Sequence, residues 1–375
     1  MKAVPKIAAL LLAYSYLISL PIAAAEKLVG QGASSEQTTV SGISSGGYMA
    51  TQFHVAYSDI VIGAGIVAGG PYYCAASEPG ENNVLTALYR CMDPCDSWPS
   101  FFRSWCELTW QPLVLIDGEE MVEYASSFAA KELIAPIANL SNDRVYLFSG
   151  EMDTTVIPAI VAENKNFYAG LGIADDALVY YRHPNAGHGF ISPKGPVACD
   201  DTGEPFVNKC DDYNQAWEIL NHLYGQNAEL NPPANTTAGT TVAFNQAAFV
   251  PDDKFEASAL ADTAYAYVPT ECETESCRIH VVFHGCKQAA AEYEVNEEYF
   301  TEVTGYNEIA DTNRIIVLYP QLRARNTMND IVKAPYNPRG CWDFWGYTGD
   351  SFYTRNGVQM RAIHDMVDQL TQQRL

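Results

Sequence analysis

Basic residues are scarce in this chain. Of its 375 residues, 22 are Lys or Arg and 45 are Asp or Glu, which gives a formal net charge of −23. Such a charge repels phosphate backbones and anionic lipid head groups, so nucleic acids and membrane surfaces are disfavoured as partners. The chain also has no internal repeat and no Ser- or Thr-rich linker. These absences argue against a repeat array and against a separate binding module.

Long apolar runs are absent after residue 25, which argues against a transmembrane helix in the rest of the chain. Before that point, Lys2 and Lys6 precede an apolar stretch that ends in three alanines at 23–25. This arrangement is typical of a secretory signal peptide. We therefore expect residues 1–25 to be removed and residues 26–375 to be secreted, to the periplasm or to the medium.

The ten cysteines are most simply explained as five disulfides, because the count is even and the chain is expected to be exported. Two pairs are close in sequence: Cys199 with Cys210, and Cys272 with Cys277. Four cysteines form a local cluster whose internal pairing stays open, and the remaining two form a long-range pair. The cluster contains Cys74, Cys91, Cys95 and Cys106, and the long-range pair is Cys286 with Cys341. A zinc site in the cluster is the alternative, but the spacing fits neither a ribbon nor a finger and no histidine lies nearby. We expect no metal and no cofactor.

The first half of the chain alternates strand-like and helix-like segments. Residues 60–68, 145–148 and 177–181 have strand patterns, and residues 48–57 and 213–224 have helical ones. This alternation predicts an α/β domain with a mostly parallel central sheet and helices on both faces. Residues 225–254 are polar and turn-rich and are expected to form a connection. A strand pair (264–269 and 278–285), a helical stretch (307–311) and a strand (315–320) follow it. We expect a single domain.

The stretch VSGISSGGYMA, residues 40–50, contains the pattern G-x-S-x-G at Gly42, Ser44 and Gly46. A serine at this position of a strand-to-helix turn acts as a nucleophile, and the N–H of the next residue, Ser45, points at the oxyanion. A flexible Gly/Ser turn is the alternative, because the motif also arises by chance. The context favours the nucleophile, since a β-branched run precedes the motif and a helical pattern follows it.

A serine nucleophile needs a base that is oriented by an acid. Asp153 follows one predicted strand, and His188 follows the next, between two glycines. The order Ser, Asp, His is that of α/β hydrolases. Other candidates fit less well. Asp143 precedes its strand and Glu151 comes earlier in the turn, while His54 and His222 lie on helical segments, His183 precedes a proline and His280 is inside a strand.

The second oxyanion donor usually comes from a His-Gly loop upstream of the serine. Only about twenty mature residues precede Ser44, and none of them fits this pattern. His284, Gly285 and Cys286 have the expected pattern but come after the histidine. The order of motifs therefore predicts a circularly permuted α/β hydrolase, joined in the segment 225–254.

Taken together, SGISSGGYMA, GEMDTTV, NAGHGF, VVFHGCKQ and GCWDFWGY resemble the polyhydroxybutyrate depolymerases with a permuted α/β-hydrolase catalytic domain. The resemblance spans roughly residues 33–370. It implies Ser44 as nucleophile, Asp153 as acid and His188 as base, with the N–H groups of Ser45 and Cys286 as the oxyanion hole. It also implies a Cys286–Cys341 disulfide and an exposed Trp342 at the mouth of the active-site crevice.

The resemblance predicts a secreted serine esterase that cleaves poly(3-hydroxybutyrate) and its oligomers through an acyl-enzyme and acts as a monomer. Many bacterial relatives carry a linker and a polymer-binding domain that this sequence lacks. Polymer adsorption is therefore expected from the catalytic domain, unless the substrate is a soluble oligomer. A carbohydrate esterase of feruloyl or acetylxylan type is one alternative, and a serine peptidase has no supporting feature. A catalytically silent polymer-surface binding protein is the alternative from another class, but it would require a damaged triad.

Overall fold

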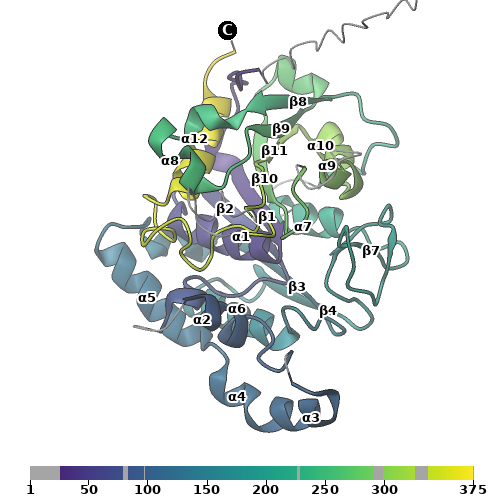
Figure 1. Ribbon diagram of the computed structural model, residues 1–375. Coiled ribbons are helices and arrows are strands. Elements are labelled where there is room, and N and C mark those ends of the chain that lie inside the picture. Colours follow the sequence, from purple (N-terminus) through teal and green to yellow (C-terminus); the bar gives the residue numbers. More distant parts are fainter. Residues whose placement is uncertain are drawn as a thin grey trace, which may run out of the picture.

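The computed structural model describes residues 26–78, 83–96, 98–225, 229–290, 299–325 and 337–374. An eight-stranded sheet in the order β4-β3-β2-β1-β10-β11-β9-β8 runs through its centre (Figure 1). Its strands are β1 (Thr38–Ile43), β2 (Val61–Val67), β3 (Arg144–Gly150), β4 (Leu178–His183), β8 (Thr240–Asn245), β9 (Thr263–Val268), β10 (Arg278–Phe283) and β11 (Ile315–Tyr319). A small second sheet contains β5 (Phe190–Ile191), β6 (Val197–Ala198) and β7 (Val207–Lys209).

Helices cover both faces of the large sheet, as the sequence predicted. The helices are α1 (Ser45–Ala56), α2 (Asn83–Arg90), α3 (Ser100–Thr109), α4 (Gln111–Val114), α5 (Gly118–Ala130), α6 (Pro158–Gly170), α7 (Gln215–Tyr224), α8 (Asp252–Ser258), α9 (Tyr299–Val303), α10 (Tyr306–Asn313) and α12 (Val358–Thr371). Successive residues of β1 show the two faces, because side chains alternate along a strand. Ser41 contacts Tyr306 of α10, with 2.6 Å between their hydroxyl oxygens, whereas Gly42 lies against Gly46 of α1.

The strand order shows the permutation directly. β1 lies in the middle of the sheet and is parallel to both of its neighbours, β2 and β10. All pairings from β4 to β11 are parallel, and the two pairings at the other edge, β11 with β9 and β9 with β8, are antiparallel. The first half of the chain builds one side of the sheet and the second half builds the other. The prediction of a circularly permuted α/β-hydrolase fold is confirmed.

Two expectations about the second half were wrong in detail. Residues 240–245 fall in the segment expected to be a connection, but they form the edge strand β8. Its side chains are mostly exposed or half-buried, so the segment lacks the apolar run of an inner strand. The strand pair predicted from residues 264–269 and 278–285 corresponds to β9 and β10, which are not neighbours because β11 lies between them. Periodicity identifies strands, but long-range pairing decides their order.

All ten cysteines are paired. The three expected pairs, Cys199–Cys210, Cys272–Cys277 and Cys286–Cys341, are present. The local cluster, whose pairing the sequence left open, forms Cys74–Cys91 and Cys95–Cys106. His183 lies close to the sulfurs of Cys199 and Cys210, but these two sulfurs are bonded to each other.

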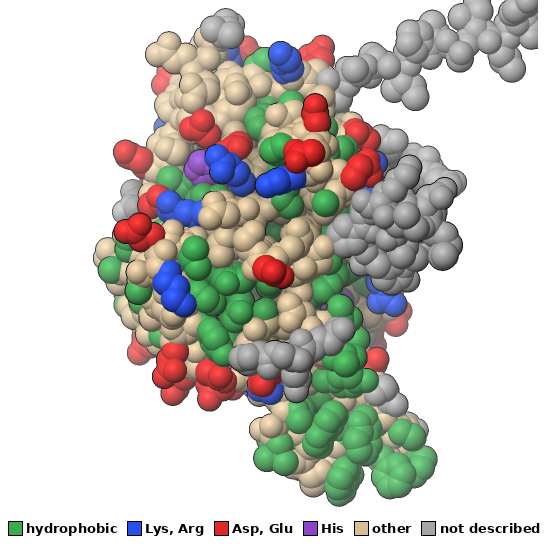
Figure 2. Space-filling model, turned by 60° about the vertical axis from the view of Figure 1, so that its left-hand side comes forward, with side chains coloured by type: hydrophobic (Ala, Val, Ile, Leu, Met, Phe, Trp, Pro, Cys, Tyr) green, Lys and Arg blue, Asp and Glu red, His purple; other side chains and the backbone are tan. Residues whose placement is uncertain are grey.

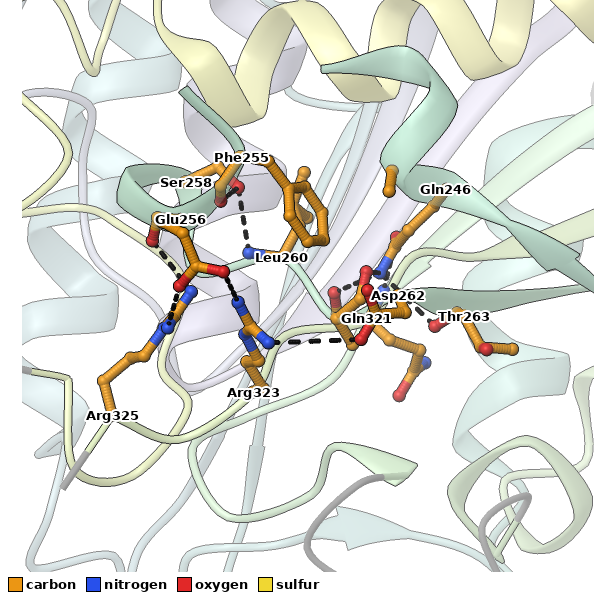
Figure 3. A network of polar contacts seen from close by, with 12 residues as sticks. Gln246, Phe255, Glu256, Ser258, Leu260, Asp262, Thr263, Gln321, Arg323 and Arg325 are labelled. Atoms are coloured by element: carbon orange, nitrogen blue, oxygen red, sulfur yellow. Dashed lines mark hydrogen bonds and ion pairs between the residues drawn. The ribbon is translucent and has the colours of Figure 1, made fainter. Parts of the chain in front are cut away.

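A network of polar side chains fixes the chain where it leaves β11 (Figure 3). Glu256 of α8 accepts hydrogen bonds from Arg325 at 2.6 Å and from Arg323 at 2.9 Å. Gln246 donates to the backbone oxygen of Gln321 at 2.7 Å. Arg325 in turn donates its backbone N–H to the oxygen of Asn337. The network therefore fixes the segment that follows β11 and, through Asn337, the beginning of the segment that carries Cys341.

Within the described ranges, no helix is long and apolar enough to cross a membrane. The predicted signal peptide, residues 1–25, lies outside the described residues.

Two histidines in the second half of the chain are buried, one on strand β10 and one just after it. His280 of β10 lies 2.7 Å from the hydroxyl of Thr39 and 2.8 Å from that of Ser41. Burial lowers the pKa of His280 from 6.5 to about 3. Burial also lowers the pKa of His284, which follows β10, to about 4. Both side chains are therefore neutral in the folded protein at pH values where the unfolded chain binds protons.

We expect the free energy of unfolding to fall as the pH decreases from about 6.5 toward 4, because only the unfolded state gains these protons in that window. Each histidine should contribute a loss of about 1.4 kcal/mol per pH unit. Urea denaturation of the parent and of His280→Asn at several pH values measures this effect. The variant should show a shallower pH dependence than the parent, and identical slopes would contradict the assignment.

Candidate active site

Ser44 lies at a sharp turn between β1 and α1. Its backbone adopts φ 57° and ψ −124°, which residues other than glycine rarely do. The two flanking glycines make this turn possible. A Cβ on Gly42 would lie 2.2 Å from the carbonyl oxygen of Gly46, and a Cβ on Gly46 would lie 2.2 Å from that of Phe283. Only glycine fits at either position, so the local structure is a nucleophile elbow rather than a flexible turn.

The N–H of Ser45 is the first donor of α1, and the first N–H groups of a helix have no partner within the helix. The helix dipole adds partial positive charge at this end. The hydroxyl of Ser45 accepts the backbone N–H of Trp342 at 3.3 Å. The side chain of Ser45 is thus used in packing, while its backbone N–H lies beside Ser44.

Asp153 and His188 follow β3 and β4 and lie together. Nδ1 of His188 is 2.7 Å from Oδ2 of Asp153, a distance at which the ring N–H donates to the carboxylate. The other oxygen of Asp153 accepts the N–H groups of Thr155 and Val156 at 2.8 and 3.0 Å. These bonds fix the carboxylate, which in turn fixes the imidazole. Both side chains are almost fully buried.

The alternative acids have other partners. Asp143 lies at the start of β3, 3.1 Å from Nε2 of the buried His54. Glu151 forms an ion pair with Arg182 on the surface. Neither carboxylate contacts His188, so the geometry favours Asp153 among the three.

The loop after β10 carries Gly285 and Cys286 past Ser44. A Cβ on Gly285 would lie 3.4 Å from Cβ of Ser44. Across the described residues, the N–H of Cys286 has no hydrogen-bond partner and can bind a ligand. The disulfide to Cys341 holds this loop covalently, and the N–H of Lys287 donates to the oxygen of Arg339 at 2.7 Å.

Gln288 connects this loop to the region of His188. Its side-chain oxygen accepts the N–H of Gly285 at 2.6 Å. Its amide nitrogen donates to the backbone oxygens of Pro205 and Phe206 at 2.9 and 3.1 Å. The ring of Phe206 packs edge-on against His188. One buried glutamine therefore connects the loop of Gly285 and Cys286 to a residue that packs against His188.

Two adjoining cavities meet at Ser44, and we call them the apolar arm and the histidine arm. The apolar arm has a volume of about 250 Å³, and the histidine arm has a volume of about 280 Å³. The histidine arm is lined by His188, Gly285, Cys286 and Gln288, among others. The apolar arm is lined mainly by apolar side chains: Tyr48, Val84, Ala87, Leu88, Met92, Val156, Phe344 and Trp345. A reacting group at Ser44 would thus have an apolar channel on one side and the base on the other.

Comparison with known proteins identifies the family. No family model matches the chain. The chain is 36% identical over 341 residues to the poly(3-hydroxybutyrate) depolymerase of Delftia acidovorans. The aligned region covers 89% of this chain but only 60% of that relative. It is 32% identical over 368 residues to the polyhydroxybutyrate depolymerase of Talaromyces funiculosus, covering 95% of this chain and 96% of that one. This chain belongs to the polyhydroxybutyrate depolymerase family.

Solved structures of such depolymerases have the same fold. The crystal structure of the PHB depolymerase from Penicillium funiculosum matches with a TM-score of 0.74 at 31% identity, over 92% of this chain and 98% of that one. A serine-to-alanine variant of a PHB depolymerase complexed with an R3HB trimer matches with a TM-score of 0.75 at 30% identity and the same coverage. The resemblance inferred from the five motifs is therefore confirmed.

One predicted depolymerase residue was placed wrongly. The sequence predicted Trp342 exposed at the crevice mouth, but its side chain is 0% exposed. It packs edge-on against Phe283 and beside His284. Trp345, three residues later, is half-buried and lines the apolar arm. Both tryptophans follow the same cysteine, so local sequence alone does not tell them apart.

The loop that carries Trp345 is shaped by a buried carboxylate. Asp343 accepts backbone N–H groups from four residues, Trp345, Gly346, Tyr347 and Thr348, at 2.6–3.2 Å. Burial raises the pKa of Asp343, and the hydrogen bonds from Thr348, Gly346 and Tyr347 oppose that rise. An aspartate three residues before a glycine is a typical turn signal, so this role could have been inferred from the sequence. The roles of Gln288 and Met92 could not, because their partners are distant in the chain.

The different places of the two tryptophans give a prediction. Trp345→Ala should leave the melting temperature almost unchanged and should lower hydrolysis of hydroxybutyrate oligomers about tenfold, because it removes one wall of the apolar arm. Trp342→Ala should instead lower stability by about 3–5 kcal/mol, since it leaves a cavity in the core. Thermal unfolding together with oligomer kinetics separates the two. The assignment fails if Trp342→Ala is as stable as the parent.

A second prediction concerns Gln288. If the N–H of Cys286 binds the oxyanion and His188 is the base, as the sequence predicts, Gln288→Ala should lower kcat for ester hydrolysis by about 10- to 100-fold with a smaller change in KM, because it frees the distance between these two groups. Gln288→Glu keeps the acceptor for Gly285 but loses the two amide donors, so it should be impaired as well. Steady-state kinetics with a soluble p-nitrophenyl ester measures both variants. A KM effect without loss of kcat would rule out this positioning role.

Proposed function

We propose that this chain hydrolyses the ester bonds of poly(3-hydroxybutyrate) and of its oligomers as a serine esterase, through an acyl-enzyme. Ser44 is the nucleophile, His188 is the base and Asp153 orients the base. One observation carries this proposal. Ser44, on an elbow that only glycine flanks allow, lines the same cavity as His188, whose Nδ1 lies 2.7 Å from the Asp153 carboxylate.

The reaction proceeds in two steps. The Ser44 oxygen attacks the ester carbonyl carbon while His188 accepts the serine proton. The negative charge on the carbonyl oxygen is stabilised by the N–H groups of Ser45 and Cys286. The C–O bond of the ester then breaks, and His188 gives its proton to the departing alkoxide oxygen, so that the product leaves with a free hydroxyl group and the acyl-enzyme remains. Water, activated by the same histidine, cleaves the acyl-enzyme and releases a carboxylic acid.

The apolar arm supports the choice of substrate. Poly(3-hydroxybutyrate) has a methyl branch on each unit and no free hydroxyl groups along the chain, so it gains from an apolar channel. A carbohydrate ester would instead require polar groups that pair with the sugar hydroxyls. Besides Ser44 and Ser45, the described lining of the apolar arm includes the polar residues Asn337 and Arg339 and is otherwise apolar, so it favours the polyester over a feruloyl or acetylxylan ester. The names of the relatives point to the same polyester.

The organisation of the chain is part of the proposal. Residues 1–25 would direct export and be removed, and residues 26–375 would act as one monomeric catalytic domain. The five disulfides support an oxidising, extracellular destination. The permutation joint would lie in the segment 225–254, which follows α7 and includes β8.

We predict that Ser44→Ala lowers ester hydrolysis by about 10⁴- to 10⁶-fold, because the acyl-enzyme cannot form. Its thermal unfolding should match that of the parent. Ser45→Ala is the matched control, since it keeps the backbone N–H, and it should lose less than about tenfold. Activity of Ser44→Ala within tenfold of the parent would disprove the assignment.

The substrate is tested by incubating the mature protein with amorphous poly(3-hydroxybutyrate) and identifying the soluble products. We expect 3-hydroxybutyrate and its short oligomers. Release of ferulate or acetate from carbohydrate esters, without polyester cleavage, would overturn the proposed substrate but not the triad.

A further inference from the structure

A helical lobe, residues 98–115, projects from the body of the protein and contains α3 and α4 (Figure 1). Hydrophobic side chains cover its outer surface (Figure 2). Phe101 is 77% exposed, Trp105 is 56% exposed, and both Leu108 and Leu113 are 80% exposed. Large apolar side chains gathered on one exposed surface mark an interaction site, because water disfavours them. None of these four side chains is needed to form the core.

The lobe is held in shape by a disulfide, ion pairs and a few aromatic contacts rather than by a buried core of its own. The disulfide Cys95–Cys106 ties the middle of α3 to the preceding turn. Arg103 pairs with Asp93 and, at 2.8 Å, with Glu107. Trp98 also packs against Trp105 and Trp110. The cross-link, the ion pairs and these ring contacts therefore keep the helix ordered while Phe101, Leu108 and Leu113 stay exposed.

The apolar surface of the lobe continues toward the catalytic crevice. Val84 and Leu88 of α2 are 47% and 45% exposed, and both line the apolar arm. Tyr89 of the same helix packs edge-on against Trp110 of the lobe. α2 therefore links the cavity that contains Ser44 to the helical lobe by apolar side chains.

Charge indicates what kind of surface the lobe fits. Arg103 and Glu107 are the only ionisable residues within 98–115 and they neutralise each other, on a chain with a net charge of −23. An anionic membrane would be repelled by the acidic body. An uncharged apolar surface meets neither repulsion nor the cost of burying an unpaired charge.

We propose that the helical lobe adsorbs to the surface of an uncharged, water-insoluble aliphatic polyester and so brings the crevice onto the polymer. The identity of the polymer rests on the proposed function, but the adsorption itself does not require catalysis. Soluble esters diffuse directly to Ser44, so their hydrolysis does not depend on the lobe.

Adsorption is measured as depletion of protein onto amorphous poly(3-hydroxybutyrate) granules, with Ser44→Ala as the background so that the surface stays intact. The test variant is Leu108→Ser with Leu113→Ser. The matched control is Val29→Ser with Val179→Ser, which changes two exposed valines outside the lobe. We expect the lobe variant to bind at least about tenfold more weakly and the control to bind like the parent. With Ser44 restored, the lobe variant should hydrolyse p-nitrophenyl butyrate within about twofold of the parent rate.

Several outcomes would overturn the proposal: equal adsorption of the lobe variant and the parent, equal loss in the control, or equally strong lobe-dependent binding to phosphatidylcholine vesicles. Concentration-dependent self-association that the lobe substitutions abolish would assign the surface to a second copy of the chain. Circular dichroism checks folding, and Phe101→Ser with Trp105→Ser decides the question if the first variant does not fold. Adsorption without any polymer cleavage by the parent would refute the proposed function alone.

Discussion

The site depends on a close contact between the start of α1 and the end of β10. Gly46 approaches the carbonyl oxygens of Phe283 and His284 so closely that a Cβ would lie 2.2 and 2.4 Å from them. This contact joins the two halves of the permuted chain at the point where Ser44 turns outward. Because the loop of Gly285 and Cys286 follows β10 directly, the same contact also sets the distance between that loop and Ser44. The strain of the positive φ at Ser44, of order 1–3 kcal/mol, is offset by the packing of the buried strand and helix around it.

The loops that carry the other residues around Ser44 are fixed by hydrogen bonds between side chains and the backbone rather than by helices or strands. Asp153 holds the turn after β3, Gln288 links the loop of Gly285 to Phe206, and Asp343 shapes the loop that carries Trp345. The disulfide Cys286–Cys341 connects two of these loops covalently. Such bonds confine the loops at the carboxyl ends of the strands, where α/β sheets bind their ligands. A preorganised site of this kind needs little rearrangement when charge develops on the substrate.

Apolar surface occurs in two different settings in this acidic protein. The apolar arm is concave and begins at Ser44, whereas the helical lobe is convex and stands away from the body. A concave channel can surround a single polymer chain, whereas a convex surface can only contact another surface. α2 borders both, since Val84 and Leu88 line the arm and Tyr89 contacts the lobe. The two surfaces together suit an insoluble polymer, because the lobe can contact the solid while the apolar arm holds one flexible chain of it.

The sequence alone determined the α/β class, the permuted order of motifs, three of the disulfide pairs and the strand ends that carry Ser44, Asp153 and His188. These features depend on short-range patterns, since glycine spacing, alternation of side chains and strand-end positions are local properties. Only the tertiary structure decided that β11 separates β9 from β10, that residues 240–245 form an edge strand, and that Gln288 spans two loops. It also placed Trp342 inside and Trp345 on the cavity wall. Burial of a loop side chain is set by the residues that pack on it, here Phe283 and His284, and those lie nearly sixty positions away in the chain.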